Sequence, residues 1–97
     1  MVIVEEHEAF SAWLKGLRDP IGRRAIVRRL TKLAATGHFG DAQSVGDGVS
    51  EMRFHVGPGY RVYYTEKDGA IVLLLCGGDK GSQQRDIEKA KKLAAEL

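Results

Sequence analysis

The apolar positions near the N-terminus predict a short strand followed by two helices. Residues 1–4 are apolar and largely β-branched, which favours a strand. The next apolar residues recur at the i, i+3, i+4 and i+7 spacing of one helical face, namely Phe10, Trp13, Leu14 and Leu17. Asp19 can cap a second helix that begins at Pro20 and stops at Gly37. We therefore expect a helical hairpin with a very short connection.

The remaining apolar positions predict the strands of a sheet and a last helix. The Gly-, Asp-, Ser- and His-rich segment 37–48 predicts a loop that holds at most a short strand near Val45. Three further strands follow, separated by two turn signals: residues 51–56, 60–65 and 70–76, with turns at 57–59 and 67–69. The last strand is continuously apolar, which is typical of a strand covered on both faces. With a final helix capped by Ser82, the order is β-α-α-β-β-β-β-α, an α+β fold in one domain over residues 1–97.

Charge is unevenly distributed along the chain. The net charge is only +2, so bulk charge does not indicate a nucleic-acid-binding protein. Between residues 9 and 36, however, seven basic residues accompany a single acid, Asp19. Such a basic block favours contact with an acidic partner, although a run of charges is also typical of a solvated helix face.

The composition argues against several classes of protein. Cys76 is the only cysteine, which excludes an internal disulfide, and the three histidines show no metal-ligand spacing. We therefore expect no metal and no other cofactor. No apolar run is long enough to span a membrane and no signal-peptide pattern is present, so we expect a cytoplasmic protein.

Four polar side chains share one face of the two central strands. Pairing these strands across the turn at 57–59 places His55 opposite Arg61 and Arg53 opposite Tyr63. Directly opposed side chains lie about 5 Å apart at Cβ. We therefore expect the four to form one open patch of the sheet, provided that the register is correct, because a slip of one residue would disperse them.

These residue types suit cleavage of RNA by the neighbouring 2′-hydroxyl. That reaction needs a base for the 2′ proton, an acid for the departing 5′-oxygen, and cations for the phosphate oxygens. Arginine matches phosphate with a planar fork, histidine carries protons near neutral pH, and tyrosine offers a hydroxyl and a stacking surface. Lys80, with Gly81 and Ser82 at the start of the last helix, can add a phosphate contact. An ordinary hairpin surface and an ordinary capped loop explain the same residues, so spacing alone leaves both interpretations open.

Four segments together resemble the RelE/ParE toxin superfamily, and most closely its HigB-like branch of phage-derived addiction module killer proteins. They are the first helix with Trp13, residues 45–54, residues 59–64, and residues 74–80 followed by Gln83 and Asp86-Ile87. The resemblance implies a helical hairpin packed on a curved antiparallel β-sheet with a C-terminal helix. It also implies a metal-independent endoribonuclease that cuts mRNA on the ribosome, and a neighbouring antitoxin, here of the HigA-like helix-turn-helix class.

The same resemblance implies roles for individual residues. Ribonucleases of the family carry basic residues before the turn, just after it and past the last strand, and these positions match Arg53, His55, Arg61 and Lys80. We expect the two arginines and the lysine to hold the scissile phosphate and His55 to transfer a proton. Some members carry a tyrosine in the final helix that is absent here, so Tyr63 is a further candidate. Contacts to ribosomal RNA are expected from Arg24, Arg28, Lys32, Lys89 and Lys92.

Two alternatives stay open at this point. A ParE-like chain would share the fold but poison DNA gyrase and need not cut RNA; the arginine, histidine and tyrosine patch favours the nuclease. A catalytically decayed toxin would only engage its antitoxin, and the tyrosine missing from the last helix leaves room for that function.

Overall fold

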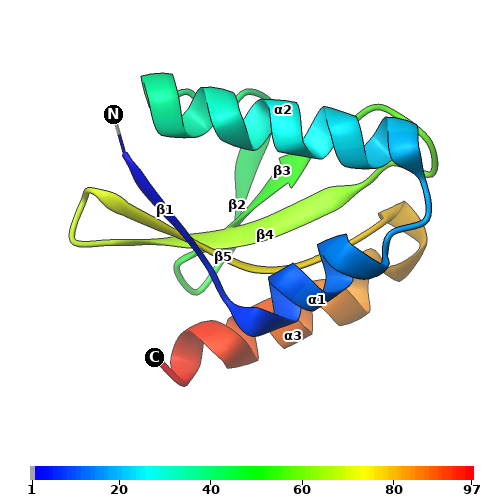
Figure 1. Cartoon of the computed structure of the whole chain (residues 1–97). Coiled ribbons are helices and arrows are strands. Elements are labelled where there is room, and N and C mark those ends of the chain that lie inside the picture. Colours follow the sequence, from blue (N-terminus) through cyan, green and yellow to red (C-terminus); the bar gives the residue numbers. More distant parts are fainter. Residues whose placement is uncertain (1) are drawn as a thin grey trace.

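The structure, a computed structural model, describes residues 2–97, so Met1 of the predicted first strand lies outside the described residues. Its elements are β1 (Ile3–Glu6), α1 (Glu8–Gly16), α2 (Pro20–Thr36), β2 (Ala42–Gly46), β3 (Val49–Arg53), β4 (Arg61–Lys67), β5 (Ile71–Gly78), a 3₁₀ turn η1 (Lys80–Ser82) and α3 (Gln83–Ala95) (Figure 1). The predicted order of helices and strands is confirmed, but the strand predicted at 51–56 spans only 49–53, and the predicted loop 37–48 contains the full strand β2. None of the helices within residues 2–97 is long and apolar enough to cross a membrane.

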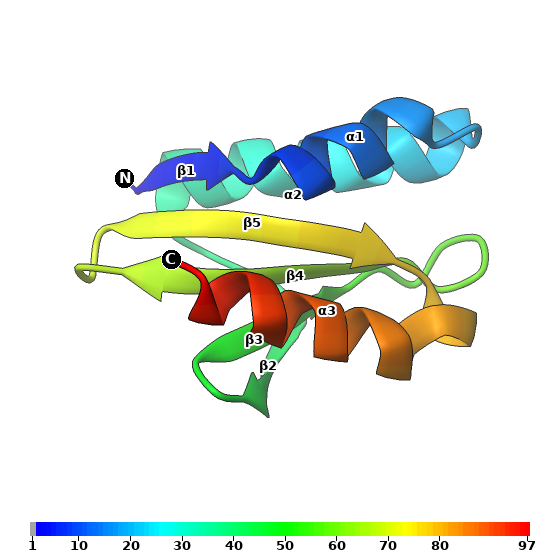
Figure 2. The same cartoon turned by 90° about the horizontal axis from the view of Figure 1, so that it is seen from below.

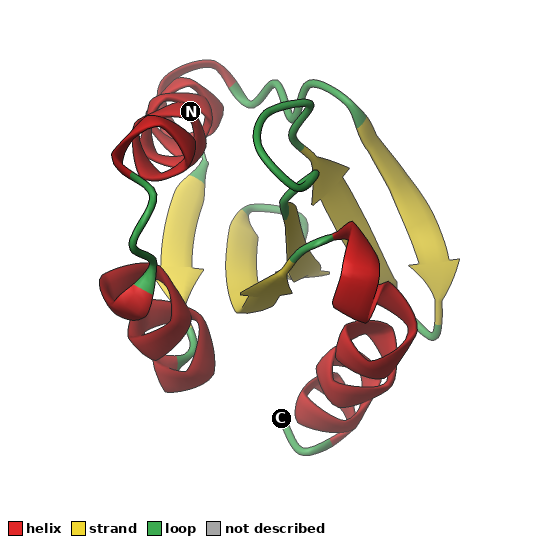
Figure 3. Ribbon diagram, turned by 90° about the vertical axis from the view of Figure 1, so that its right-hand side faces the viewer, coloured by secondary structure: helices red, strands yellow, loops and turns green. Residues whose placement is uncertain are grey.

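The strands form one sheet in the order β1-β5-β4-β3-β2. The pairs among β2, β3, β4 and β5 are antiparallel, whereas β1 runs parallel to β5, so the sheet is mixed rather than purely antiparallel. Helices α1 and α2 cover one face and α3 covers the other (Figures 2 and 3). Leu74 faces the helical hairpin while Leu73 and Leu75 face α3, which confirms that this apolar strand is covered on both sides.

Asp19 joins the two helices of the hairpin and also fastens them to the sheet. Its Oδ1 accepts the N–H of Gly22 at 3.0 Å, which is the predicted cap of α2, and its Oδ2 accepts the hydroxyl of Tyr60 at 2.8 Å. Burial, followed by the bond to Asp19, raises the pKa of Tyr60 to about 12, so the phenol stays a donor. A side chain at position 22 would overlap the Tyr60 ring. These contacts fix the loop between β3 and β4 over the α1–α2 junction.

We expect Asp19 to make the fold sensitive to acid. The N–H of Gly22 and the hydroxyl of Tyr60 hold the pKa of this carboxyl below its ordinary value. Because the folded-state pKa is the lower one, the stabilisation is present above the unfolded-state pKa and is lost as pH falls through the folded-state pKa. Asp19→Asn can still cap the helix but cannot titrate. Its melting temperature, followed by circular dichroism, should therefore fall less steeply than that of the wild type below roughly pH 5; parallel curves would exclude Asp19 as the acid-sensitive group.

The register of β3 and β4 differs by two residues from the predicted one. Arg53 lies opposite Arg61, and Glu51 lies opposite Tyr63. The chain leaves β3 after Arg53, and the N–H of Phe54 donates to the carbonyl of Tyr60 at 2.9 Å, so the intervening loop is wider than a tight hairpin turn. The predicted pairs of His55 with Arg61 and of Arg53 with Tyr63 are therefore wrong. Because side chains alternate with a period of two, a shift of two residues leaves each strand residue on its predicted face.

Candidate functional site

Two arginines face each other where β3 and β4 meet the loop. Arg53 pairs with Arg61, and Arg61 pairs in turn with Gly78 near the end of β5. Both arginines project toward the α3 side of the sheet, the same side as Tyr63. Like charges directly opposed across a sheet are destabilising unless anions compensate them. The partners of each guanidinium therefore decide what this end of the sheet can bind.

Arg61 is nearly buried, and within residues 2–97 no carboxylate pairs with it. Arg61 as a whole is only 8% exposed. None of the ion pairs among the described residues includes it. One guanidinium nitrogen, Nη1, donates weakly to the carbonyls of Gly59 and Tyr60, at 3.3 Å each, and Nε has no hydrogen-bond partner among the described residues. Burying a cation without a counter-charge is costly. An anion that reached this guanidinium would supply the partner that the fold itself does not.

Lys80 lies beside Arg61, across the backbone of Gly59. A Cβ built on Gly59 would lie 3.4 Å from Cβ of Lys80 and 3.7 Å from Nη1 of Arg61. Gly59 has a φ of 80°, which glycine adopts without strain. The exposed lysine and the recessed arginine thus flank a stretch of bare backbone, and this arrangement suits a phosphate that approaches closely.

The start of the last helix does not add the backbone contacts expected of it. Asp79 caps η1, and its Oδ1 accepts the N–H groups of Gly81 at 2.8 Å and Ser82 at 3.2 Å. These donors are the ones proposed from the sequence to hold a phosphate with Lys80, and they are already satisfied. Of the two interpretations that the sequence left open for this loop, an ordinary cap is the one observed, but Asp79 supplies it; the predicted cap, Ser82, makes no side-chain capping bond to α3.

Asp41 links Arg53 to His55. Its Oδ1 accepts both Nε and Nη2 of Arg53, at 3.2 and 2.7 Å, while its Oδ2 lies 2.6 Å from Nε2 of His55. These bonds, that to Arg53 first, hold the pKa of the Asp41 carboxyl below its ordinary value, so it remains an anion. The charge of Arg53 is therefore already compensated, unlike that of Arg61.

Asp41 was missed by the sequence analysis. It precedes β2, in a loop whose composition indicates only irregular structure. The antiparallel pairing of β2 with β3 brings it next to Arg53, whose N–H donates to the Asp41 carbonyl at 2.8 Å. Recognising β2 as a full strand would have been the signal, because its register then places Asp41 at the end of β3.

Tyr63 does not lie on an open surface. It is fully buried beneath α3, opposite the equally buried Glu51, and its hydroxyl has no hydrogen-bond partner within residues 2–97. Burial above all, and then the nearby Glu51 carboxylate, raises the pKa of this hydroxyl. Glu51 in turn accepts the side-chain amides of Gln43 and Gln83 at 3.0 Å each. The predicted open patch is wrong at Tyr63, because α3 covers this part of the face, and at Arg61, which is nearly buried as well.

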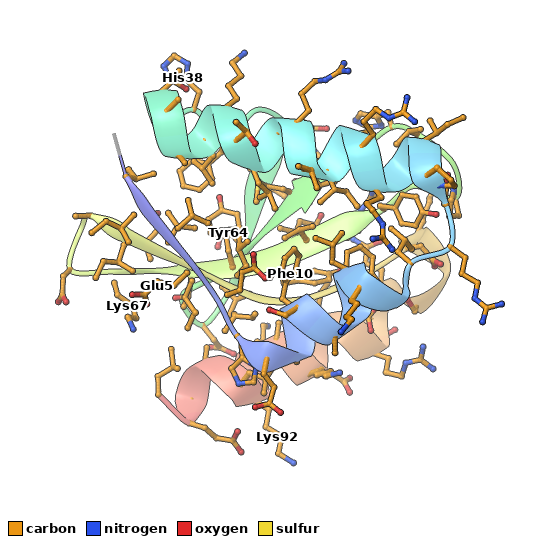
Figure 4. All side chains as sticks on the ribbon, in the orientation of Figure 1. Glu5, Phe10, His38, Tyr64, Lys67 and Lys92 are labelled. Carbon is orange, nitrogen blue, oxygen red and sulfur yellow. The ribbon has the colours of Figure 1, made fainter. Side chains whose placement is uncertain are left out.

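The predicted RNA-binding residues are exposed but divide into two groups. Arg24, Arg28 and Lys32 lie on α2, whereas Lys89 and Lys92 lie on α3, across the sheet. Figure 4 shows Lys92 pointing away from the sheet on the side opposite α2. Arg28 and Lys32 line a groove between α2 and the β3–β4 loop together with Phe54 and His55. The α2 group therefore adjoins His55, and the five residues do not form one continuous patch.

Comparison with known sequences places the chain in a family. The sequence model described as "Phage derived protein Gp49-like" matches residues 12–96. An uncharacterized protein of Haemophilus influenzae is 47% identical over 88 residues, which cover 91% of this chain and 88% of that protein.

Comparison with solved structures identifies the fold. The E. coli toxin RelE, in a double arginine-to-alanine mutant solved in the free state, is similar with a TM-score of 0.72 at 15% identity, covering 94% of this chain and 96% of that chain. The isolated E. coli RelE toxin gives a TM-score of 0.66 at 12% identity, covering 92% and 98%. The α+β fold predicted from sequence and its likeness to the fold of RelE are confirmed, and the predicted phage-derived family is confirmed as Gp49-like. With a fold like that of RelE and a family match over residues 12–96, this chain belongs to the Gp49-like family of phage-derived proteins.

Proposed function

We propose that this chain is the toxin of a toxin–antitoxin pair and that it acts by cutting mRNA. The family and the RelE-like fold support the class of protein. The observation that carries the nuclease is the nearly buried guanidinium of Arg61, which lacks a carboxylate partner within residues 2–97 and lies beside the exposed Lys80. His55 is linked to this pair indirectly: it shares Asp41 with Arg53, and Arg53 lies opposite Arg61.

In the proposed reaction the 2′-hydroxyl of one nucleotide attacks the adjacent phosphorus. The 2′ proton passes to the neutral imidazole of His55 while the P–O2′ bond forms. The P–O5′ bond then breaks and the departing 5′-oxygen takes a proton from water, which leaves a 2′,3′-cyclic phosphate and a 5′-hydroxyl. Arg61 and Lys80 stabilise the negative charge that builds on the non-bridging oxygens.

The α2 side of the site suits the rest of the RNA. Arg28 and Lys32 line the groove that contains His55, and Arg24 lies one turn before Arg28 on the same helix. We assign these residues to backbone phosphates of mRNA or ribosomal RNA, a contact that depends on charge rather than on sequence. Lys89 and Lys92, on α3, would serve a separate contact with the ribosome. The proposed antitoxin is a HigA-like helix-turn-helix protein, supported by the family resemblance alone.

The experiment that tests this function is induced expression in bacteria with mapping of mRNA 5′ ends. Growth arrest accompanied by new 5′ ends inside coding regions is the expected result. Addition of purified chain to messenger alone and to messenger on ribosomes then tests ribosome dependence, and cleavage should need the ribosome. Growth arrest with intact transcripts and an induced DNA-damage response would contradict the nuclease and indicate a gyrase poison. An induced chain that leaves growth unchanged would indicate a decayed toxin.

Tyr63→Phe is expected to leave mRNA cleavage unchanged and to raise stability slightly. The substitution removes a buried hydroxyl that has no hydrogen-bond partner among the described residues, and such an unsatisfied group costs about 1–3 kcal/mol. The ring and its packing under α3 stay in place. Urea unfolding should give an equal or higher midpoint, and 5′-end mapping should give the wild-type pattern. Loss of cleavage in a variant that still folds would show that the Tyr63 hydroxyl takes part in the reaction.

A further inference from the structure

Asp41 is held in place at its backbone as well as at its carboxylate. Its carbonyl accepts the N–H of Arg53 at 2.8 Å and Nη2 of Arg29 at 2.9 Å. Arg29 reaches across from α2, donates also to the carbonyls of Phe39 and Arg53 at 3.0 and 2.8 Å, and stacks over the Phe54 ring at 4.3 Å. Because the guanidinium of Arg53 also holds Oδ1, the other carboxylate oxygen, Oδ2, points in one fixed direction.

His55 lies in the direction in which Oδ2 of Asp41 points, and it is otherwise open to solvent. Its side chain is 75% exposed, and the ring hydrogen bond that the structure shows runs from Nε2 to Oδ2 of Asp41. The other charged groups around it are cations: Arg28, Arg29 and Lys32 from α2, and Arg53 from β3. Asp41 is therefore the group in a position to orient the imidazole, and Nδ1 is left for another partner.

We propose that Asp41 is the positioning residue of the site: it holds His55 with its proton on Nε2, so that Nδ1 carries the lone pair that takes the 2′ proton of the RNA. A carboxylate can only accept hydrogen bonds, so the nitrogen facing it must carry hydrogen. In the neutral ring the other nitrogen is then the base. The step at the RNA rests on the proposed function, whereas the tautomer of His55 does not.

The proposal changes the role of Arg53. Its guanidinium is committed to Oδ1 of Asp41 through two hydrogen bonds. Arg53 therefore fixes the carboxylate and, through it, the imidazole. The contact with the scissile phosphate is left to Arg61 and Lys80, whose charges are not committed in this way.

Asp41→Asn tests the tautomer directly. The amide oxygen can still accept from Arg53, which turns the NH₂ group toward His55 and replaces an acceptor by a donor. We expect ¹⁵N NMR of the neutral rings to show His55 with its proton on Nε2 in the wild type and on Nδ1 in the variant. His7 is the internal reference, because its Nδ1 accepts the N–H of Ala9 at 3.0 Å and its ring proton must stay on Nε2 in both chains. A His55 tautomer that is the same in both chains would overturn the proposal.

Kinetics of mRNA cleavage separate positioning from a general loss of structure. Asp41→Asn should lower kcat by about 10²- to 10⁴-fold with KM nearly unchanged, because the wrong nitrogen faces the RNA. In a His55→Ala background the same substitution should have no further effect, and an equal loss there would show that Asp41 acts through the fold and would overturn the proposal. A His55→Ala chain that cleaves at the wild-type rate would remove His55 from the proposed reaction, while the NMR result would still decide whether Asp41 sets the tautomer.

Discussion

Replacing Arg61 by alanine is expected to abolish growth arrest and to lower mRNA cleavage by about 10²- to 10³-fold, the usual loss when a preorganised donor to a developing negative charge is removed. Arg61 is the cation of the site that is held nearly buried, and it has no carboxylate partner within residues 2–97. A recessed cation of this kind acts on a bound phosphate with little screening by solvent. The guanidinium of Arg53, directly opposite Arg61, cannot readily replace it because Asp41 already holds it through two hydrogen bonds.

The fold should survive this change. Within residues 2–97 the side chain of Arg61 makes two weak hydrogen bonds, both to nearby backbone carbonyls at 3.3 Å. Removing an unpaired buried charge costs little and often stabilises a protein. Circular dichroism melts of Arg61→Ala should therefore match or exceed those of the wild type, so that a loss of activity cannot be attributed to unfolding.

Two further variants sharpen the result. Arg61→Lys keeps the charge but loses the planar fork, so cleavage should lie between that of the wild type and that of the alanine variant. Arg18→Ala is the matched control, since Arg18 is an exposed arginine between α1 and α2 to which the proposed site assigns no role; it should remain fully toxic. An Arg61→Ala chain that still arrests growth and cuts mRNA would show that Arg61 has no role in cleavage. The main support for the proposed nuclease function would then be lost.

Gly77→Ala is expected to give the largest loss of stability, about 1–3 kcal/mol. Gly77 lies near the end of β5, and a Cβ there would overlap the indole of Trp13. The indole cannot easily retreat, because the rings of Phe10 and Tyr60 hold it, with centroids at 6.0 and 6.1 Å. In a domain of this size the loss is a large share of the total stability. It should also weaken the site, since β5 pairs with Arg61 at the next residue, Gly78.

Urea unfolding of Gly77→Ala and of a glycine control would measure this effect. Gly16→Ala is that control, because Gly16 lies at the end of α1, has helical backbone geometry, and a Cβ there would meet nothing within 4 Å. Alanine is the better helix former, so Gly16→Ala should be neutral or slightly stabilising. Equal midpoints for the two variants would mean that Trp13 moves aside at no cost, contrary to the packing described above.

The helices of this chain could be predicted because their signals are local. Asp19 caps α2 through the N–H of Gly22, and Gly37 ends it with a φ of 77°, as the sequence indicates. Both features depend on residues within one turn of the helix. The strand faces were also predictable, since the period of two in β3 and β4 assigns Met52 and Val62 to one side without knowledge of the partner strand.

The residues that meet across strands could not be obtained in the same way. The register of β3 and β4 depends on the loop between them, and that loop is held by Tyr60 on Asp19, 41 residues away in sequence. Asp41 reaches His55 only because β2 pairs with β3 and because Arg29 crosses from α2 to hold its backbone. Such contacts leave no periodic trace in the sequence.

What the sequence by itself determined is therefore the two helices of the hairpin, the order of helices and strands, and the side of the sheet that each residue of β3 and β4 takes, because these follow from neighbouring residues along one chain segment. Only the tertiary structure decided what covers each side. The packing of α3 buries Tyr63, whereas Arg61, on the same strand face, remains 8% exposed at its end. The alternation of apolar and polar residues predicts the direction in which a side chain points. Whether solvent or RNA can reach that side chain depends on helices and strands that are distant in the sequence.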